Sequence, residues 1–236
     1  MSDQTIELIS SRVLFEDNHL IIVNKLPGEI VQGDKTGDEP MVLTIKNYIK
    51  HKYNKPGEAF LGLVHRIDRP VSGAVIFAKT SKALSRMTQL IKNRDFIKIY
   101  LAITDSLPPS GEQHLKNYLK KNEAANKSVI VSSEKQGGKL AELSYIHRAS
   151  GKTLHLLEIN LFTGRHHQIR AQLAAAGLPI RGDVKYGAKR PNKDGSINLH
   201  AYRIIFNHPV GGKKIEVMAP PPKTPEWIAF SSWANI

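Results

Sequence analysis

Two apolar segments enclose a short polar loop in the stretch Leu63-Val64-His65-Arg66-Ile67-Asp68-Arg69-Pro70-Val71-Ser72-Gly73-Ala74-Val75-Ile76-Phe77-Ala78. Residues 60–64 and 74–78 are short and apolar, which predicts two buried strands. Pro70 and Gly73 are turn-forming residues. Residues 65–72 are therefore expected to form an ordered loop on a rigid frame, the kind of position at which functional side chains concentrate.

One carboxylate, Asp68, lies among basic side chains in this loop. His65, Arg66 and Arg69 are its neighbours in the sequence, and their positive potential favours the ionised carboxylate. An ionised carboxylate in an ordered loop is a candidate nucleophile or base. The alternative is a turn-forming aspartate whose side chain bonds its own backbone. The loop by itself leaves both interpretations open.

The chain carries a large excess of positive charge. It has 34 Lys and Arg against 21 Asp and Glu, a formal net charge of +13, in 236 residues of otherwise ordinary globular composition. Such an excess favours binding to polyanions such as nucleic acids, although a basic surface can also be only a solvated face. The basic residues recur in separate clusters rather than in one tail: Lys46, Lys50, Lys52 and Lys55, then Lys116, Lys120 and Lys121, then Lys185, Lys189, Arg190 and Lys193.

Several classes of protein are excluded. The sequence has no cysteine, which rules out disulfides, thiolate metal sites and cysteine nucleophiles. The N-terminus lacks the basic start and apolar core of a signal peptide, and no apolar run reaches membrane-spanning length. We therefore predict a cytoplasmic protein that does not associate with a membrane.

Hydrophobic periodicity predicts a mixture of helices and strands. The helices are expected at 40–53, 81–91 and 171–176, with a short one around Trp227 and Phe230. Further strands are expected at 12–15, 19–25, 95–103, 140–147, 153–161, 199–206 and 213–218. The period of two over 95–103 places Lys98 and Tyr100 on one face of their strand.

The domain organisation is predicted to be simple. The sequence shows no internal repeat and no convincing linker, so residues 1–236 are expected to form a single domain. Residues 1–10 are expected to be a flexible N-terminus. Residues 107–138 are rich in Lys, Asn, Ser and Gly and are expected to form a flexible or hairpin-like excursion.

Four separate blocks resemble motifs of the RluA-type pseudouridine synthase family. Residues 65–73 are similar to the family's H-R-L-D-x-x-T-S-G, and residues 98–102 are similar to its K-x-Y-x-A strand. Residues 163–170 resemble T-G-R-x-H-Q-I-R, and residues 179–187 resemble P-I-x-G-D-x-x-Y-G. The blocks follow in the family's order within about residues 15–220. The chain departs from the family's motifs at Ile67, Val71 and Gln172. None of these departures removes a group that the chemistry needs.

The resemblance implies a fold and an activity. The fold is a pseudouridine synthase catalytic domain of the α+β class, with a largely antiparallel sheet, flanking helices and a central cleft. The activity is isomerisation of specific uridines in ribosomal or transfer RNA, a step of rRNA or tRNA processing that needs no metal and no other cofactor. RNA is then the partner, and the protein is expected to be a monomer. No added N-terminal RNA-binding module is expected, because the catalytic-type sequence starts near Ser11.

The resemblance also implies roles for individual residues. Asp68 is the catalytic carboxylate, and its action as nucleophile or as base stays open. Arg170 pairs with Asp68 and keeps it ionised, and Tyr100 stacks on the target base. Arg66 fills the gap left when the uridine is flipped out of the RNA. The remaining candidates orient the loops or contact the RNA: His65, Lys98, Arg165, His167 and Gln168.

Alternatives to these assignments remain. A catalytically silent RNA-binding protein could have the same fold, and a nucleoside glycosidase would release free uracil. Asp183 could be a second acid, although its position after Gly182 favours a turn. His166 and His167 lack the spacing of zinc ligands, and we expect adjacent histidines on a helix to point apart, which argues against a metal site.

Overall fold

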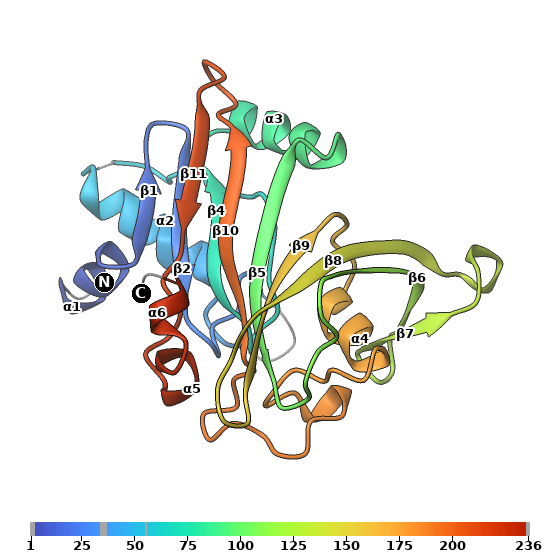
Figure 1. The fold of residues 1–236 in the computed structure, drawn as a ribbon. Coiled ribbons are helices and arrows are strands. Elements are labelled where there is room, and N and C mark those ends of the chain that lie inside the picture. Colours follow the sequence, from blue (N-terminus) through green and yellow to red (C-terminus); the bar gives the residue numbers. More distant parts are fainter. Residues whose placement is uncertain (1–2, 34–36, 55, 235–236) are drawn as a thin grey trace. The chain divides into compact units, whose positions relative to one another are not determined.

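The chain folds into two compact units (Figure 1). The structure is a computed structural model that describes residues 3–33, 37–54 and 56–234. The first unit comprises the described residues up to 96 together with 201–220, and the second comprises 97–200 and the described residues from 221 onward. The single catalytic domain stays a prediction, because compactness does not show whether either unit folds alone.

A sheet forms the centre of the first unit. Its strands lie in the order β1-β2-β4-β10-β11, and the short strand β3 also pairs with β4. The pairs β1–β2, β2–β4, β3–β4 and β10–β11 are antiparallel. The strand bounds are β1 Val13–Glu16, β2 Leu20–Lys25, β3 Gly62–Leu63, β4 Ser72–Ala78, β10 Leu199–Asn207 and β11 Lys214–Met218.

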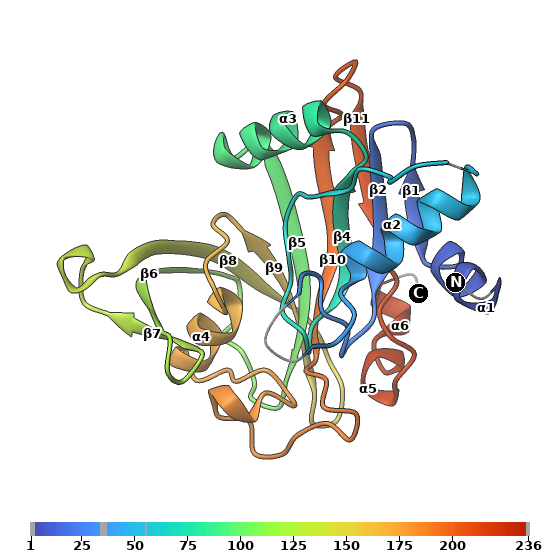
Figure 2. The same ribbon diagram turned by 180° about the vertical axis from the view of Figure 1, so that it is seen from behind.

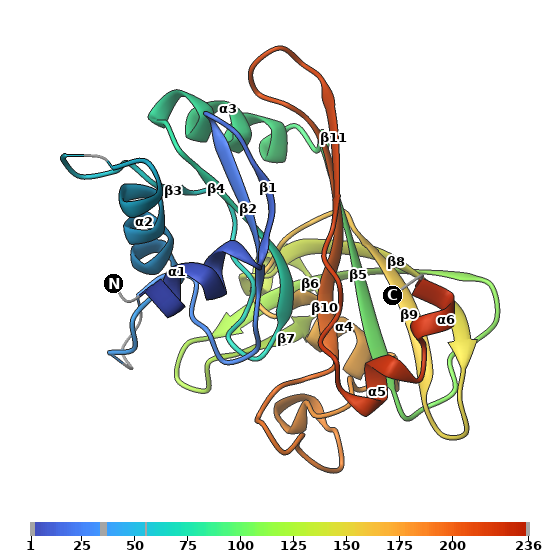
Figure 3. The same ribbon diagram turned by 90° about the vertical axis from the view of Figure 1, so that its left-hand side faces the viewer.

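Three helices accompany this sheet: α1 Asp3–Ser10, α2 Met41–Lys52 and α3 Ser81–Lys92. Figure 2 shows α2 crossing β2 and β4, and Figure 3 shows α1 beside α2. Helix α3 begins where the sequence indicates, because Thr80 Oγ1 accepts a hydrogen bond of 3.1 Å from the Ala83 N–H.

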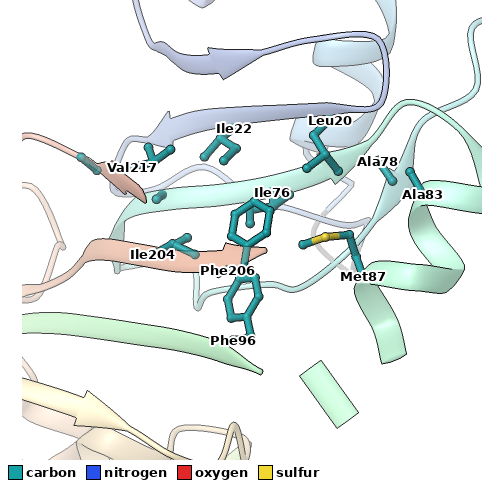
Figure 4. Close-up of a cluster of buried hydrophobic side chains, with 12 residues drawn as sticks. Leu20, Ile22, Ile76, Ala78, Ala83, Met87, Phe96, Ile204, Phe206 and Val217 are labelled. Carbon is teal, nitrogen blue, oxygen red and sulfur yellow. The ribbon is translucent and has the colours of Figure 1, made fainter. Parts of the chain in front are cut away.

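One face of the sheet packs against α3 (Figure 4). Alternate residues of β2 and β4 point to this face, and Ala83 and Met87 of α3 cover them. The rings of Phe96 and Phe206 stack there with centroids 5.4 Å apart. Every residue of β4 is buried, as expected for the continuous apolar run that follows the Asp68 loop. The strand that anchors the loop is therefore enclosed on both faces.

Five further strands form the centre of the second unit. They lie in the order β5-β9-β8-β6-β7, and all neighbouring pairs are antiparallel. Helix α4 packs against β6 and β7, where Leu119, Ala141, Ala171 and Tyr186 form a buried cluster. The bounds are β5 Phe96–Thr104, β6 Glu112–Asn122, β7 Lys127–Val131, η1 Glu134–Gln136, β8 Lys139–Ser150, β9 His155–Leu161, α4 Gln168–Ala175, η2 Val184–Tyr186, α5 Pro225–Ile228 and α6 Ser231–Ala234.

The structure confirms the α+β class and most predicted elements. The predicted strands and helices recur within a few residues of their expected bounds. For residues 107–138, the hairpin-like alternative applies, because β6 and β7 pair with each other. The central cleft stays a prediction. None of the helices described is both long and apolar enough to cross a membrane.

The flexible N-terminus expected at 1–10 stays a prediction; its described residues form helix α1, in which Ile9 is 2% exposed. One local prediction was wrong. The strand expected at 60–64 is reduced to Gly62–Leu63, and Phe60 is 46% exposed. Gly62 lies opposite Ala78, the last residue of β4, so residues 60 and 61 have no part of that strand to pair with.

Gly73 allows β4 to lie close to β10. Its φ is +120°, and a Cβ at this position would lie 2.3 Å from the Ala201 carbonyl oxygen and 2.5 Å from the Ala201 nitrogen. Both atoms belong to the backbone, so no side-chain rotation could relieve the contact. The glycine of the loop block is therefore a packing requirement of the first unit.

We expect Gly73→Ala to destabilise the protein more than Gly28→Ala does. Gly28 also has a positive φ, +87°, but open space surrounds its Cβ position. Gly28→Ala should lower the free energy of unfolding by about 1–2 kcal/mol through backbone strain alone, and Gly73→Ala should add a further ~1–3 kcal/mol from the clash. Urea unfolding of both variants measures the difference. Equal losses would show that β10 does not press on Gly73.

Candidate active-site residues

Backbone hydrogen bonds hold the Asp68 loop in the first unit. The Val71 N–H donates to the Asp68 carbonyl oxygen at 3.0 Å, which closes a tight turn. The Gly28 N–H donates to the Arg69 carbonyl oxygen at 2.9 Å. Arg66 and Arg69 are exposed, whereas Asp68 is half-buried. The loop thus keeps its shape through main-chain hydrogen bonds.

Lys25 also restrains the loop, and the sequence analysis missed it. Its side chain has 0% exposure, and Nζ donates to the carbonyl oxygens of Leu26 at 2.9 Å, Arg69 at 3.0 Å and Val71 at 2.7 Å. Burial lowers the pKa of Lys25 to about 7, while the charges of Glu29 and Asp68 act in the opposite direction. A lysine at the end of the apolar strand Leu20–Lys25 was the available signal.

The segment after β2 braces the loop from another direction. Arg12 donates to both carboxylate oxygens of Glu29 at 2.8 Å, and Glu29 Oε2 accepts from the Leu26 N–H at 2.8 Å. An ion pair of 2.6 Å joins Arg69 to Asp38. The ion pair connects the loop to a residue 31 positions earlier in the chain, which a search for local motifs does not detect.

His65 connects the start of the loop to the core of the first unit. Its Nε2 accepts a hydrogen bond of 3.3 Å from the Ile76 N–H, and its ring lies edge-on to Phe96 with centroids 6.0 Å apart. Of the two roles expected for His65, these contacts favour orienting the loop over contacting phosphate.

In the second unit, Arg170 forms a bidentate ion pair with Asp183. Arg170 Nε and Nη2 donate to the two carboxylate oxygens of Asp183 at 2.7 and 2.9 Å. The side chains are only 6% and 1% exposed, so the pair is a buried fork of the kind that fixes a guanidinium in one orientation. Of the alternatives for Asp183, this partnership supports a structural role.

Gln168 and Arg165 support the turn that precedes α4. Gln168 Oε1 accepts from Thr163 Oγ1 at 2.8 Å and from the Arg165 N–H at 3.0 Å, and Gln168 Nε2 donates to the Glu142 carbonyl oxygen at 3.1 Å. Arg165 Nε donates to the Leu140 carbonyl oxygen at 2.9 Å. Both side chains thus satisfy backbone groups that a tight turn leaves without partners.

The two adjacent histidines behave differently from the prediction. Their rings stack with centroids 3.8 Å apart and an interplanar angle of 21°. They do not diverge, because α4 begins only at Gln168 and His167 has a left-handed φ of 50°. Within the described ranges no group of three or more His, Cys, Asp or Glu side chains could hold a metal ion.

Lys98 and Tyr100 lie at alternate positions of β5. Tyr100 is buried, and burial lowers the pKa of Lys98. A Cβ added to Gly164 would lie 3.4 Å from Lys98 Nζ, so the lysine reaches the turn that precedes α4. Tyr100 and Arg170 belong to the second unit and Asp68 to the first. Their partnership therefore stays a prediction.

Known proteins resemble this chain over most of its length. A sequence profile described as RNA pseudouridylate synthase matches residues 19–175. A protein of Buchnera aphidicola named ribosomal large subunit pseudouridine synthase C is 34% identical over 217 residues, covering 89% of this chain and 67% of the relative. A Pasteurella multocida protein of the same name is 31% identical over 218 residues, covering 90% of this chain and 65% of the relative. The chain thus spans about two thirds of these relatives.

Two solved structures show the same fold. Human RNA pseudouridylate synthase domain containing 4 has a TM-score of 0.76 and 21% identity, covering 98% of this chain and 95% of its own. Human RNA pseudouridylate synthase domain containing 1 has a TM-score of 0.69 and 22% identity, and the match covers 96% of this chain and 89% of the human chain. The profile match, the identity to the curated relatives and the shared fold lead to one conclusion: this chain belongs to the RNA pseudouridylate synthase family, as its four sequence blocks predict.

Proposed function

We propose that this protein isomerises uridine to pseudouridine in ribosomal RNA, with Asp68 as its catalytic carboxylate. Family membership supports the reaction, and the names of the relatives from Buchnera aphidicola and Pasteurella multocida favour large-subunit ribosomal RNA over transfer RNA. The net charge of +13 suits an RNA substrate. The observation that carries the proposal is the block 65–73, whose half-buried carboxylate stands on a loop held by a buried lysine.

The reaction needs a carboxylate beside the sugar. The bond between N1 of uracil and C1′ of ribose breaks, the base turns, and C5 bonds to C1′. C5 then loses its proton, and N1 gains one, so atoms and electrons balance without a redox step. Ordinary glycoside hydrolysis usually uses two carboxylates, one to protonate the leaving oxygen. Here the uracil is detached and then joined again to the same ribose, so one ionised carboxylate is enough. The carboxylate can act either by attacking C1′ or by removing a proton.

The remaining residues take the roles that the family resemblance implies. We propose that Arg170 keeps Asp68 ionised, that Tyr100 stacks on the flipped uracil and that Arg66 occupies the vacated position in the RNA stack. The bidentate pair with Asp183 supports the role of Arg170, because it fixes the guanidinium in one orientation. His65, Lys98, Arg165, His167 and Gln168 would orient the loops and contact the RNA backbone.

Asp68→Asn should abolish isomerisation and leave RNA binding largely intact. The amide keeps the shape of the carboxylate but loses its charge, so the rate should fall at least about a hundredfold, whereas phosphate contacts supply most of the affinity. Unmodified large-subunit ribosomal RNA labelled with tritium at C5 of uridine reports the reaction, because forming the new bond releases this hydrogen to water. The matched control is Asp95→Asn, which changes an exposed carboxylate.

The outcomes of this assay separate the alternatives. Appreciable turnover by Asp68→Asn would overturn the assignment of Asp68. Binding without tritium release by the wild type would support a silent RNA-binding protein, and free uracil would indicate a glycosidase. Pseudouridine mapping of cellular RNA from a strain lacking the protein, complemented with wild type or Asp68→Asn, then identifies the RNA and the modified uridine.

Lys25→Met should change the pH dependence of stability. The pKa of Lys25 is about 7 in the folded protein against an ordinary value of 10.5. Between these pH values the unfolded chain holds a proton that the folded protein has released. The free energy of unfolding therefore rises with pH by up to about 1.4 kcal/mol per unit from this residue, and the variant lacks this rise.

Urea unfolding at pH 7, 8 and 9 measures the effect. The stability advantage of the wild type over Lys25→Met should grow across this series. Lys82→Met, which changes an exposed lysine of α3, should follow the wild type. Parallel curves for wild type and Lys25→Met would show that Lys25 keeps its ordinary pKa in the folded protein.

Arg170→Met should destabilise the protein by about 3–5 kcal/mol, because it leaves the Asp183 carboxylate buried without its guanidinium. The double variant Arg170→Met, Asp183→Leu should recover much of this loss, since no buried charge remains. Its isomerisation should stay lost if Arg170 also serves Asp68. Thermal unfolding and tritium release separate the two roles. Full activity of the stable double variant would contradict the catalytic role of Arg170.

A further inference from the structure

We propose that Tyr186 is a positioning residue for Arg170, through which the β6–β7 hairpin fixes the guanidinium. The inference deepens the proposed function and rests on it. Tyr186 is the tyrosine of the block 179–187, and the sequence analysis assigned it no role. Its ring and its hydroxyl make different contacts, and the proposal depends on both.

The ring of Tyr186 lies against the guanidinium of Arg170. The distance from Arg170 Cζ to the ring centroid is 5.0 Å, within the range of a cation–π contact. Asp183 holds the same guanidinium by its bidentate pair. The Tyr186 N–H donates to the Asp183 carbonyl oxygen at 3.0 Å. The two groups that orient Arg170 therefore come from a single turn of chain and move together.

The hydroxyl of Tyr186 connects this turn to the hairpin. It accepts a hydrogen bond of 2.7 Å from the N–H of Ser128, a buried residue at the start of β7. It also forms a hydrogen bond of 3.0 Å with Nδ1 of His167, immediately before α4. Lys127 Nζ lies 4.8 Å from the ring centroid. Through its hydroxyl and its ring, Tyr186 thus connects its own turn to β7 and to the start of α4.

Ser128 links the hairpin to the start of α4 a second time. Its Oγ donates to the His166 carbonyl oxygen at 2.6 Å, and Asn126 in the hairpin turn lies 3.2 Å from His166 Nε2. The hairpin therefore contacts the residues immediately before α4 and, through Tyr186, the ring that faces Arg170. Arg170 lies on the first turn of that helix. The same hairpin holds both its helix and its guanidinium.

The hydroxyl fixes the tilt of the ring. Without it, the buried Ser128 N–H loses its acceptor and His167 loses a partner, so the ring keeps its packing and its contacts with Arg170 and Lys127 but loses the hydrogen bonds that orient it. The face that the ring presents to Arg170 is then free to shift. A displacement of about 1 Å in a group that orients catalysis can cost on the order of a hundredfold in rate. The alternative is that Tyr186 only fills the cluster with Leu119, Ala141 and Ala171.

Tyr186→Phe tests the proposal, because it keeps the ring and removes the oxygen. The matched control is Tyr118→Phe, the same change on β6, where the side chain lies against Gly138. Single-turnover tritium release from unmodified large-subunit ribosomal RNA, with enzyme in excess, measures the rate, and filter binding of the same RNA measures affinity. Both are measured below the melting temperature of each variant.

Tyr186→Phe should lower the single-turnover rate by about tenfold to a hundredfold, with RNA affinity close to that of the wild type, and Tyr118→Phe should change neither. A rate for Tyr186→Phe within about twofold of the wild type would overturn the proposal. So would equal losses of rate and affinity, which would indicate a contact with RNA or a general loss of structure. If the wild type releases no tritium, the proposed function itself fails.

Combining Tyr186→Phe with Arg170→Lys separates positioning from packing. If Tyr186 acts through Arg170, the two rate losses should not multiply, because the lysine no longer presents the planar fork that the ring orients. The double variant should then be about as slow as Arg170→Lys alone. Losses that multiply would show that Tyr186 acts independently of Arg170 and would contradict the proposal.

Discussion

The buried amino group of Lys25 is the constraint on which the Asp68 loop of the first unit depends. A lysine at 0% exposure needs hydrogen-bond acceptors from the protein in place of water, and three carbonyl oxygens supply them. Two of them belong to Arg69 and Val71, so the loop must adopt the shape that brings these oxygens together. The electrostatic requirement of one buried group thus sets the backbone that carries Asp68.

The second unit also contains a buried basic side chain, which it holds in an ion pair. Arg170 and Asp183 are almost completely removed from water, and the fork geometry with its two hydrogen bonds repays part of the desolvation. Tyr186 closes the guanidinium on a further side. In both units a buried basic side chain is held in one orientation, by carbonyl groups in the first and by a carboxylate and a ring in the second. Such rigidity suits a reaction that has to detach and rejoin a base without losing it.

Several residues of the family blocks have structural contacts in addition to their proposed roles with RNA. Gln168 supports the turn before α4, Arg165 donates to a carbonyl of β8, and His65 accepts from the backbone of β4. A tight loop leaves backbone groups without partners, and nearby polar side chains are the available substitutes. A motif can therefore be specific because its members hold the loop as well as because they touch a ligand.

The sequence by itself determined the class of fold, most helices and strands, the family and the carboxylate to test, because periodicity and contiguous motifs are local properties of the chain. Only the tertiary structure showed what holds the candidate residues. Lys25 lies 44 and 46 residues before two of the three carbonyls it binds, those of Arg69 and Val71. Asp183 follows Arg170 by 13 residues and lies beyond the end of α4. His166 stacks on His167 because both residues precede α4 and His167 has a left-handed backbone conformation. Contacts between distant residues and the exact start of a helix are decided by packing and by burial of charge, which a linear pattern does not encode.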